Sequence, residues 1–564
     1  MHTCYQRFRE VLTLAEAKLA AEDTRTAVGL LQIAARYAFP VRVGILASPR
    51  LEALLLEAGK RITNLPFEGV ERRNGRQRRV LHVLSYGRPV GGDTRFVWRW
   101  IQQDKENQHF VAITTQADVA GLYEIPEPLK VSAEASGGWL RTLTALPDDP
   151  LKQAQELRAL CQQADVVVLH LFPYDIVPIL ALAAGCDGVK TIFVNHSDHT
   201  FWVGGSVAHS VAHLRRQSAE FLETKRALKV DGAPIIAIPL NDVERKIPRE
   251  DAKRRLGYPS QSVLLLTIAS PFKYGAPGAT GFLELVVPVL ERLPQAMLVA
   301  VGPEPNGVWL EARTTTGGRI TALGTRWDTD LLYAAADIYL DSVPFSSITS
   351  LVEAGSHGNP LLGFAMREGE LSLLGPGAPG IDETMIIAQD CASYRNQLTR
   401  LITDAEYRLT CGDRVRNAIV SLHTGDYWNE RVQELYTHVE RQQGVALLEH
   451  RDQFEASPLP LALSRLYSQA NARKMIAKHL SGLPYTRRAR TSVELSARGF
   501  DQSYMSLLPP PLDSLVRTAR RWGKKTVVRM MRRGLSLEPA KSDWQLATAF
   551  TSSRSQRDNQ GRPQ

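Results

Sequence analysis

The stretch VVVLHLFPYDIVPILALAAGCDGVKTIFVN, residues 166–195, begins and ends with a short apolar run. Continuous runs of Val, Ile and Leu are typical of strands that are buried on both faces of a parallel sheet. The segment between the runs contains His170, Pro173, Asp175 and Pro178, which a bilayer-spanning helix rarely contains together. The stretch therefore predicts a strand, a helix and a second strand of one α/β sheet.

The same alternation extends along most of the chain in both directions. Further short apolar runs are bounded by Gly, Pro, Asn or Asp, and a charged, helix-like link at residues 241–257 separates them into two groups. We therefore predict an α/β protein with two Rossmann-like, doubly wound lobes at residues 78–240 and 258–445, the second closed by a helix that starts at Asp426. The further runs are VLHVL from Val80, FVAIT from Phe110, IIAIP from Ile235, VLLLTI from Val263, MLVAV from Met297, ITALG from Ile320, DIYLD from Asp337 and PLLGF from Pro360.

The two ends of the chain differ in pattern from its middle. Apolar residues recur every three or four positions in residues 1–75, which predicts an N-terminal helical segment, either a cap or one unit of a degenerate helical repeat. We expect residues 450–564 to form a basic helical extension with a disordered end. Residues 512–533 can form a basic amphipathic helix, which suits either an anionic membrane surface or docking on the protein by its apolar side.

Charge and cysteine content restrict the class of protein. Of the net charge of +9, residues 501–564 carry +7, with twelve Lys and Arg against five Asp and Glu. The body of the chain is therefore almost neutral, and a main role in nucleic-acid binding is poorly supported. The five cysteines are scattered and the first residues lack a signal-peptide pattern. We therefore expect a cytoplasmic location, to which residues 512–533 would add peripheral attachment to the inner face of the membrane.

Ligands of open α/β sheets bind outside the carboxyl ends of the strands, so the segments after the apolar runs are candidate sites. Gly91 and Gly92 form a strand-to-helix turn whose backbone N–H groups could bind phosphate, although an ordinary tight turn also uses glycine. Lys273 follows the first run of the second lobe, in a loop rich in glycine and proline. There it could neutralise a diphosphate leaving group or simply be solvated.

The segment HSDHTFWVGG, residues 196–205, is the most polar cluster of the first lobe. His196 or Asp198 could be the general base that deprotonates an acceptor hydroxyl, because imidazole titrates near neutrality and a nearby carboxylate can orient it. A metal site and ordinary loop hydrogen bonding or helix capping are the alternatives, and the other ligands that a metal needs are not evident. His209 and His213 lack the glutamate of a zinc-protease motif, and we interpret them as packing or surface residues.

The segment VPFSSITSLVEAGSHGNPLLG, which starts at Val343, carries the most information about function. Ser346, Ser347 and Thr349 supply hydroxyls at the start of a predicted helix, whose free N–H groups and dipole favour phosphate. Glu353 lies one to two turns further along that helix. Capping and packing would explain Ser347 and the glycines, but they do not require a glutamate that faces a cleft.

In this order the segments resemble the GT-B glycosyltransferases over residues 78–445, in particular bacterial glycosyltransferase group 1 and O-GlcNAc-transferase-like enzymes. VLHVLSYGRPVGGDT looks like the first strand and glycine loop of that family, TIASPFKYG like its phosphate loop, and VPFSSITSLVEAGSHGNPLLGF like its donor motif. The resemblance implies that Glu353 holds the nucleotide ribose and that Lys273 and Arg326 face the phosphates. Many retaining members have a second glutamate where this chain has Phe345, which weakens a retaining assignment.

We therefore predict a hexosyltransferase-like enzyme that moves a sugar from a UDP- or GDP-linked donor to a hydroxyl of a glycan, a lipid-linked molecule or a protein. The second lobe would bind the donor and the first the acceptor. The nucleotide sugar is a co-substrate; we expect no cofactor and, as the resemblance implies, no essential metal. The resemblance to bacterial enzymes also points to synthesis of surface polysaccharides or glycoconjugates. The alternatives are a nucleotide-sugar epimerase of the same fold and a catalytically inactive, membrane-associated scaffold.

Overall fold

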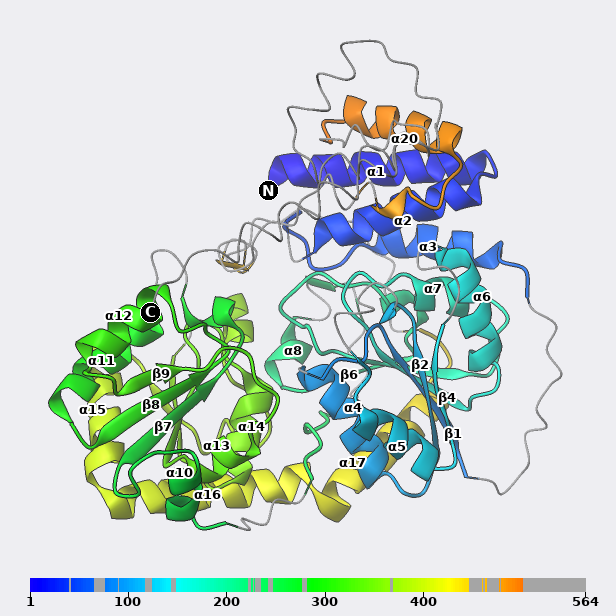
Figure 1. Cartoon of the computed structure of the whole chain (residues 1–564). Helices are drawn as coiled ribbons and strands as arrows, with labels where there is room; N and C mark the ends of the chain where they lie inside the picture. Colours follow the sequence, from blue (N-terminus) through cyan, green and yellow to red (C-terminus); the bar gives the residue numbers. More distant parts are fainter. Residues whose placement is uncertain are drawn as a thin grey trace, which may run out of the picture. The chain divides into compact units, whose positions relative to one another are not determined.

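A computed structural model of the chain contains two parallel β-sheets, each covered by helices (Figure 1). The structure describes residues 1–39, 42–64, 77–89, 91–116, 124–143, 149–221, 225–226, 228, 235–241, 247–275, 281–365, 369–445, 459, 462–463, 476 and 478–500. The predicted amphipathic helix at 512–533 lies outside these residues.

The first sheet has six parallel strands in the order β3-β2-β1-β4-β5-β6. All five residues of β4 are buried, as expected for a strand that is covered on both faces. The strands are β1 (Arg79–Leu84), β2 (Gln108–Ile113), β3 (Leu140–Thr142), β4 (Val166–His170), β5 (Lys190–Val194) and β6 (Ser210–Ala212). The helices of this part of the chain are α4 (Gly92–Gln103), α5 (Glu127–Ala135), α6 (Pro150–Cys161), α7 (Val177–Leu182), η2 (Gly205–Val207) and α8 (Gln217–Glu220).

The second sheet is also parallel and has six strands in the order β12-β11-β10-β7-β8-β9. Its strands are β7 (Val263–Ile268), β8 (Ala296–Val301), β9 (Ile320–Ala322), β10 (Ile338–Leu340), β11 (Leu361–Phe364) and β12 (Ile386–Ala388). Its helices are α10 (Arg249–Arg255), η3 (Pro271–Tyr274), α11 (Phe282–Arg292), α12 (Gly307–Thr315), α13 (Asp330–Ala335), α14 (Ile348–Ser356), η4 (Gly369–Leu374), α15 (Cys391–Thr403), α16 (Ala405–His423) and α17 (Gly425–Arg441).

Most of the predicted strands are present, but IIAIP does not form one of the named strands. Ile235 makes an isolated parallel bridge to His213, and the residues that follow it are extended without a ladder. Ile236 and Ile238 are nevertheless buried, and the carbonyl of Ala237 accepts a hydrogen bond from the Trp428 indole at 2.7 Å. This run is apolar because it is packed against α17, and apolar periodicity alone does not distinguish that environment from a sheet.

The N-terminal segment forms three helices, and a fourth from the end of the described chain joins them: α1 (His2–Ala20), α2 (Thr24–Ala38), α3 (Pro49–Lys60) and α20 (Tyr485–Ala497). Ser48 caps α3 by accepting from the backbone N–H of Leu51 at 3.2 Å, and Pro49 occupies the first helical position. The buried apolar side chains of these helices belong to the same cluster as those under the first sheet. The helices therefore extend the core of the first lobe.

Helix α17 packs on the first lobe, although we predicted that it would close the second. It contacts β5 and β6, and in Figure 1 it lies beside α4. The Trp100 indole donates to the Tyr436 hydroxyl at 3.0 Å, and Arg78 forms an ion pair with Glu440 at 2.8 Å. The chain thus crosses back to its first lobe after completing the second.

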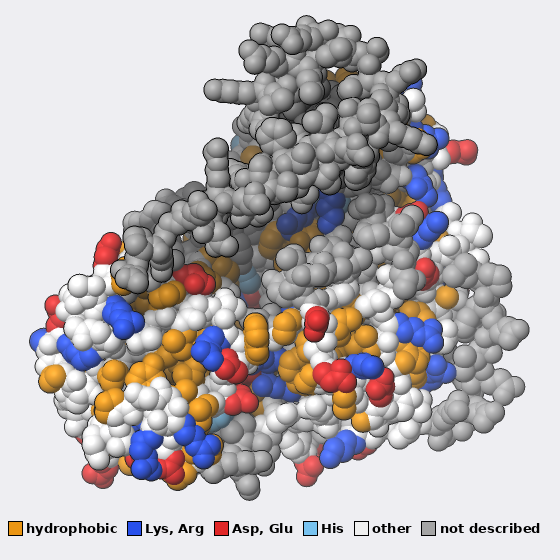
Figure 2. All heavy atoms as spheres, in the orientation of Figure 1, with side chains coloured by type: hydrophobic (Ala, Val, Ile, Leu, Met, Phe, Trp, Pro, Cys, Tyr) orange, Lys and Arg blue, Asp and Glu red, His pale blue; other side chains and the backbone are white. Residues whose placement is uncertain are grey.

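Two Rossmann-like lobes of this kind constitute the GT-B fold, so the predicted fold class is confirmed. Within the part of the chain that the structure describes, no helix has the length and apolar character needed to cross a membrane. On the face shown in Figure 2, acidic and basic side chains are mixed over both lobes, in keeping with the near-neutral charge of the body of the chain.

Candidate functional site

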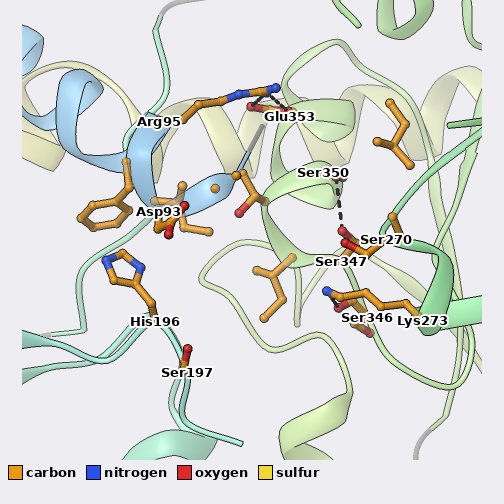
Figure 3. A pocket seen from close by; sticks show the side chains of 18 of the residues that line it. Asp93, Arg95, His196, Ser197, Ser270, Lys273, Ser346, Ser347, Ser350 and Glu353 are labelled. Carbon is orange, nitrogen blue, oxygen red and sulfur yellow. Dashed lines mark hydrogen bonds and ion pairs between the residues drawn. The ribbon is translucent and has the colours of Figure 1, made fainter. Parts of the chain in front are cut away.

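A cleft of about 410 Å³ is lined by residues of both lobes. First-lobe residues such as His196 and Asp93 face second-lobe residues such as Lys273 and Ser347 across it (Figure 3). All the site residues predicted from the sequence line this cleft: Gly91, Gly92, His196, Asp198, Lys273, Arg326, Ser346, Ser347, Thr349 and Glu353. Their proximity is therefore established, while the role of each stays a prediction.

The turn before α14 is held in place by Asp341, a buried residue that follows β10. Its carboxylate accepts from the Ser346 hydroxyl at 2.5 Å and from the backbone N–H groups of Ser342 and Ser347 at 2.9 and 3.0 Å. Ser347 occupies the N-cap of α14 but its side chain does not cap the helix; its hydroxyl lies 3.3 Å from that of Ser350. The first turn of α14 therefore lacks a side-chain cap at a position where helix geometry favours an anion.

Lys273 lies in η3, next to this turn. Its ammonium group donates to the backbone carbonyl of Ser346 at 2.8 Å and lies 4.4 Å from the centre of the Phe345 ring. Burial lowers the pKa of Lys273 to about 8, although the Asp341 carboxylate acts in the opposite direction. Lys273 is thus a partly desolvated cation at the edge of the cleft, whereas Arg326 is well exposed and pairs with Asp328.

Glu353, the predicted ribose ligand, forms ion pairs with the first lobe. Arg95 and Arg99 of α4 each lie 2.8 Å from its Oε1 atom, and the Tyr333 hydroxyl donates to Oε2 at 3.1 Å. Burial alone would raise the pKa of Glu353, but Arg99 and Arg95 lower it below its usual value. The two arginines were not identified from the sequence, although their spacing of four residues on a helix is a recognisable signal for one shared partner.

The glycine turn of the first lobe approaches α14 closely. A Cβ atom at Gly92 would lie 2.4 Å from the Thr349 hydroxyl, so a larger residue there would have to displace the Thr349 side chain. Gly91 has a φ of 153°, a conformation that glycine adopts with little strain. The turn therefore brings the backbone of one lobe to the helix N-terminus of the other.

The two candidate bases in the first lobe differ sharply in their surroundings. Arg215 donates to both carboxylate oxygens of Asp198 at 2.5 Å, and the Ser218 hydroxyl donates to it as well. Burial alone would raise the pKa of Asp198, but Arg215 and His199 hold it well below its usual range. A carboxylate with these partners stabilises the loop and is a weak base.

His196 has a free ring nitrogen instead. Its Nε2 atom lies 3.0 Å from His170 Nδ1, while Nδ1 has no hydrogen-bond partner among the described residues. Burial lowers the pKa of His196 to about 4, although the nearby Asp93 carboxylate opposes this shift. His196 is therefore a neutral imidazole at physiological pH, and its pKa lies below the near-neutral value that we expected from the sequence.

The N-terminal helices help to hold the loop that carries these residues. Glu52 of α3 is buried, and it accepts from the backbone N–H groups of Gly204 and Gly205 at 2.6 and 3.1 Å and from the Ser206 hydroxyl. A role for the N-terminal helices in positioning the loop at residues 196–206 was not predicted, because a single glutamate in an apolar helix has no sequence signature.

Within the described ranges, no group of three or more His, Cys, Asp and Glu is arranged to hold a metal ion.

Comparison with known proteins gives short or distant similarities. No family model matches the sequence. Over 134 residues the chain is 31% identical to the UDP-N-acetylglucosamine–N-acetylmuramyl-(pentapeptide) pyrophosphoryl-undecaprenol N-acetylglucosamine transferase of Thermus thermophilus. This match covers 24% of the chain and 35% of that protein, so the chain spans about a third of the length of this relative.

Solved structures with a related arrangement have low sequence identity. HepE of Anabaena, in complex with UDP and glucose, has a TM-score of 0.48 and 14% identity, with coverage of 64% of this chain and all (100%) of that one. A mutant O-GlcNAc transferase of Thermobaculum terrenum has a TM-score of 0.45 and 16% identity, with coverage of 78% and 82%. The assignment of the fold rests on the two sheets themselves and not on these similarities.

Proposed function

We propose that this protein is a glycosyltransferase that moves a sugar from a nucleotide-linked donor to a hydroxyl acceptor. The observation that carries the proposal is the pairing of two complementary groups across one cleft: the uncapped start of α14 with Lys273 on one side, and the neutral imidazole of His196 on the other. The first suits a diphosphate, and the second suits a hydroxyl that must lose a proton.

In this mechanism the diphosphate of the donor binds at the start of α14, beside Ser347 and Lys273. Lys273 offsets the negative charge that develops as the bond between the anomeric carbon and the phosphate oxygen breaks. His196 Nδ1 accepts the proton of the acceptor hydroxyl while the oxygen of that hydroxyl forms a bond to the anomeric carbon. Asp198 keeps the loop in place through Arg215 and takes no part in proton transfer.

Glu353 would hold the nucleotide ribose, and this role requires it to share its carboxylate with Arg95 and Arg99. The shared use is chemically reasonable because a carboxylate offers about four lone-pair positions to donors. Binding of the donor and the contact between the two lobes would then depend on the same carboxylate.

The sequence similarity supports a UDP-linked donor as the first to test, because the Thermus thermophilus protein is named for transfer from UDP-N-acetylglucosamine. A bacterial role in surface polysaccharide or glycoconjugate synthesis is consistent with that name and is part of the proposal. The nearest alternative is a nucleotide-sugar epimerase, which would use the same donor side of the cleft but would form no new glycoside.

Calorimetry with UDP, GDP, ADP and their sugar conjugates tests the donor side. We expect one nucleotide to bind, and Glu353→Gln and Ser347→Ala to weaken its binding; loss of one charge-assisted hydrogen bond costs about 1.5–3 kcal/mol. Arg254→Ala is the matched control, because Arg254 is an exposed cation of the second lobe that is paired with Asp251 and is not among the residues that line the cleft. Product analysis then separates a new glycoside from an epimerised sugar. A folded protein that binds none of these nucleotides would contradict the proposal.

A further inference from the structure

A row of hydrogen-bonded histidines crosses the first sheet and ends at the cleft. His109 on β2, His82 on β1 and His170 at the end of β4 lie on three neighbouring strands. His196 follows the next strand, β5. The ring nitrogens are separated by 3.0 Å from His109 Nδ1 to His82 Nε2, 3.1 Å from His82 Nδ1 to His170 Nε2, and 3.0 Å from His170 Nδ1 to His196 Nε2.

Packing does not account for this row. His82 and His109 are completely buried and His170 is nearly so, and the strand residues nearest to them on this face, such as Val80, Val166 and Val168, are apolar. Trp100 of α4 covers them, with its ring centre 5.5 Å from that of His82. A valine or leucine would fill such positions without the cost of desolvating a polar ring, which is tolerated only when the ring is hydrogen-bonded.

The inner end of the row fixes the direction of its hydrogen bonds. His109 Nε2 lies 3.0 Å from the backbone carbonyl of Asp104, which can only accept, so this nitrogen carries a hydrogen. In a row without charge, His109 accepts at Nδ1 from His82, His82 accepts at Nδ1 from His170, and His170 accepts at Nδ1 from His196. Every ring of the uncharged row is then an Nε2–H tautomer, and His196 presents the lone pair of Nδ1 to the cleft.

The row ends beside a buried carboxylate that can balance a positive charge. Asp104 Oδ2 lies 3.4 Å from His109 Nε2 and accepts from the Tyr436 hydroxyl at 2.9 Å. Asn107 and Gln433 donate to Oδ1 at 2.8 and 3.2 Å. Burial alone would raise the pKa of Asp104, but the hydrogen bond from His109, the positive charge of that ring when it is protonated, and the hydrogen bonds from Asn107 and Tyr436 lower it below its usual value.

We propose that His170, His82, His109 and Asp104 form a proton relay behind His196, an inference that rests on the proposed sugar transfer. The acceptor proton binds His196 Nδ1, and the Nε2 proton of His196 passes to His170 Nδ1. His170 and His82 each pass on their own Nε2 proton in the same way, so that His109 finally holds two protons next to the Asp104 carboxylate. The positive charge thus moves away from the cleft. After the product departs, the extra proton passes back along the row to His196 and from there to solvent.

The tautomers can be measured without any activity. NMR of the full chain with isotope-labelled histidine, at neutral pH, is expected to show His82, His109, His170 and His196 as neutral Nε2–H rings. Single His→Leu variants assign the signals. A neutral Nδ1–H form of His196, or a charged ring within the row at rest, would overturn the proposal whether or not the protein transfers sugar.

Kinetics test the use of the row. UDP release from UDP-N-acetylglucosamine, with water as the acceptor hydroxyl, is compared for wild type, His82→Leu and the control His209→Leu. His209 is a histidine of the same lobe outside the row, whose Nδ1 accepts from the backbone N–H of Thr191 at 3.2 Å. We expect His82→Leu to lower kcat by about tenfold or more, up to the roughly 10²–10⁴-fold of general acid–base catalysis, and to leave KM unchanged. The control should change neither.

Each of the other kinetic outcomes also decides whether the histidine row is a proton relay. An unchanged kcat in a folded His82→Leu variant would overturn the relay while the proposed function stands. A rise in KM with unchanged kcat would also overturn it, because it would mean that the row only shapes the cleft. If wild type binds the nucleotide sugar but neither hydrolyses nor transfers it, the proposed function fails, and the relay fails with it even if the tautomers are as expected. If His82→Leu does not fold, the tautomers of the wild-type protein decide.

Discussion

The side chains at the carboxyl ends of the two sheets differ in how they are hydrogen-bonded. In the second lobe, α14 begins without a side-chain cap, and Lys273 and the hydroxyl of Ser347 lie at the edge of the cleft. In the first lobe, Asp198 is fully paired with Arg215, and His196 is connected to a row of buried histidines. The second lobe offers a helix start without a side-chain cap, where Lys273 and Ser347 contact only groups of the same turn and helix, whereas the first offers groups that are connected to one another across several strands.

This difference follows from what each side must do in the proposed reaction. A diphosphate enters and leaves in every turnover, so backbone dipoles and a partly desolvated cation bind it without a rearrangement of the protein. A proton must be accepted at a fixed atom, so the receiving nitrogen needs one tautomer, which only neighbouring groups can impose. A variant on one side of the cleft that changes the function of the other side would show that the two tasks are not separate.

Removal of the base has the largest expected effect. His196→Ala should lower kcat for transfer, or for UDP release to water, by roughly 10²–10⁴-fold because general-base catalysis is lost. Calorimetry with UDP should give an unchanged affinity, since the groups that we propose to bind the donor, Lys273, Ser347 and Glu353, lie on the second lobe. If UDP affinity falls together with kcat, the two sides of the cleft are not separate in function.

A matched variant, Asp198→Ala, is expected to act on stability. It leaves Arg215 buried without its partner, which typically costs about 3–5 kcal/mol of unfolding free energy. Denaturant unfolding measures this loss, and Asp328→Ala is the control, because its pair with Arg326 is exposed and should not change the midpoint. A stable Asp198→Ala protein with low kcat would instead make Asp198 the base.

The second lobe was more predictable from sequence than the first. Ser347 and Glu353 lie within a few residues of each other on one helix, so a local pattern was enough to find them. The row of histidines joins residues that are far apart in the chain, and only the order of the strands brings them together. His82 and His170 looked like single polar residues within apolar runs, and nothing local distinguishes a hydrogen-bonded ring from an isolated one.

The errors in the predicted fold have a related cause. The IIAIP run is apolar because of its contact with α17, and α17 returns to the first lobe through contacts such as that of Tyr436 with Trp100. Both features depend on packing between segments separated by about 190 and 340 residues in sequence, as the Ala237–Trp428 and Trp100–Tyr436 pairs show. Hydrophobic periodicity reports that a segment is buried but does not identify the segment that buries it.

The smallest expected effect concerns the charge of Lys273. Because its pKa is about 8, the ammonium group loses its proton as the pH rises through that value, and its attraction for a diphosphate is then lost. UDP affinity should therefore fall about tenfold for each pH unit above about 8, until binding no longer depends on Lys273. Lys273→Met should bind UDP more weakly at neutral pH and show no such decline, as measured by calorimetry across the same pH series. An equally steep decline in the variant would assign the titration to another group, and the donor side would then depend on the helix N-terminus without the lysine.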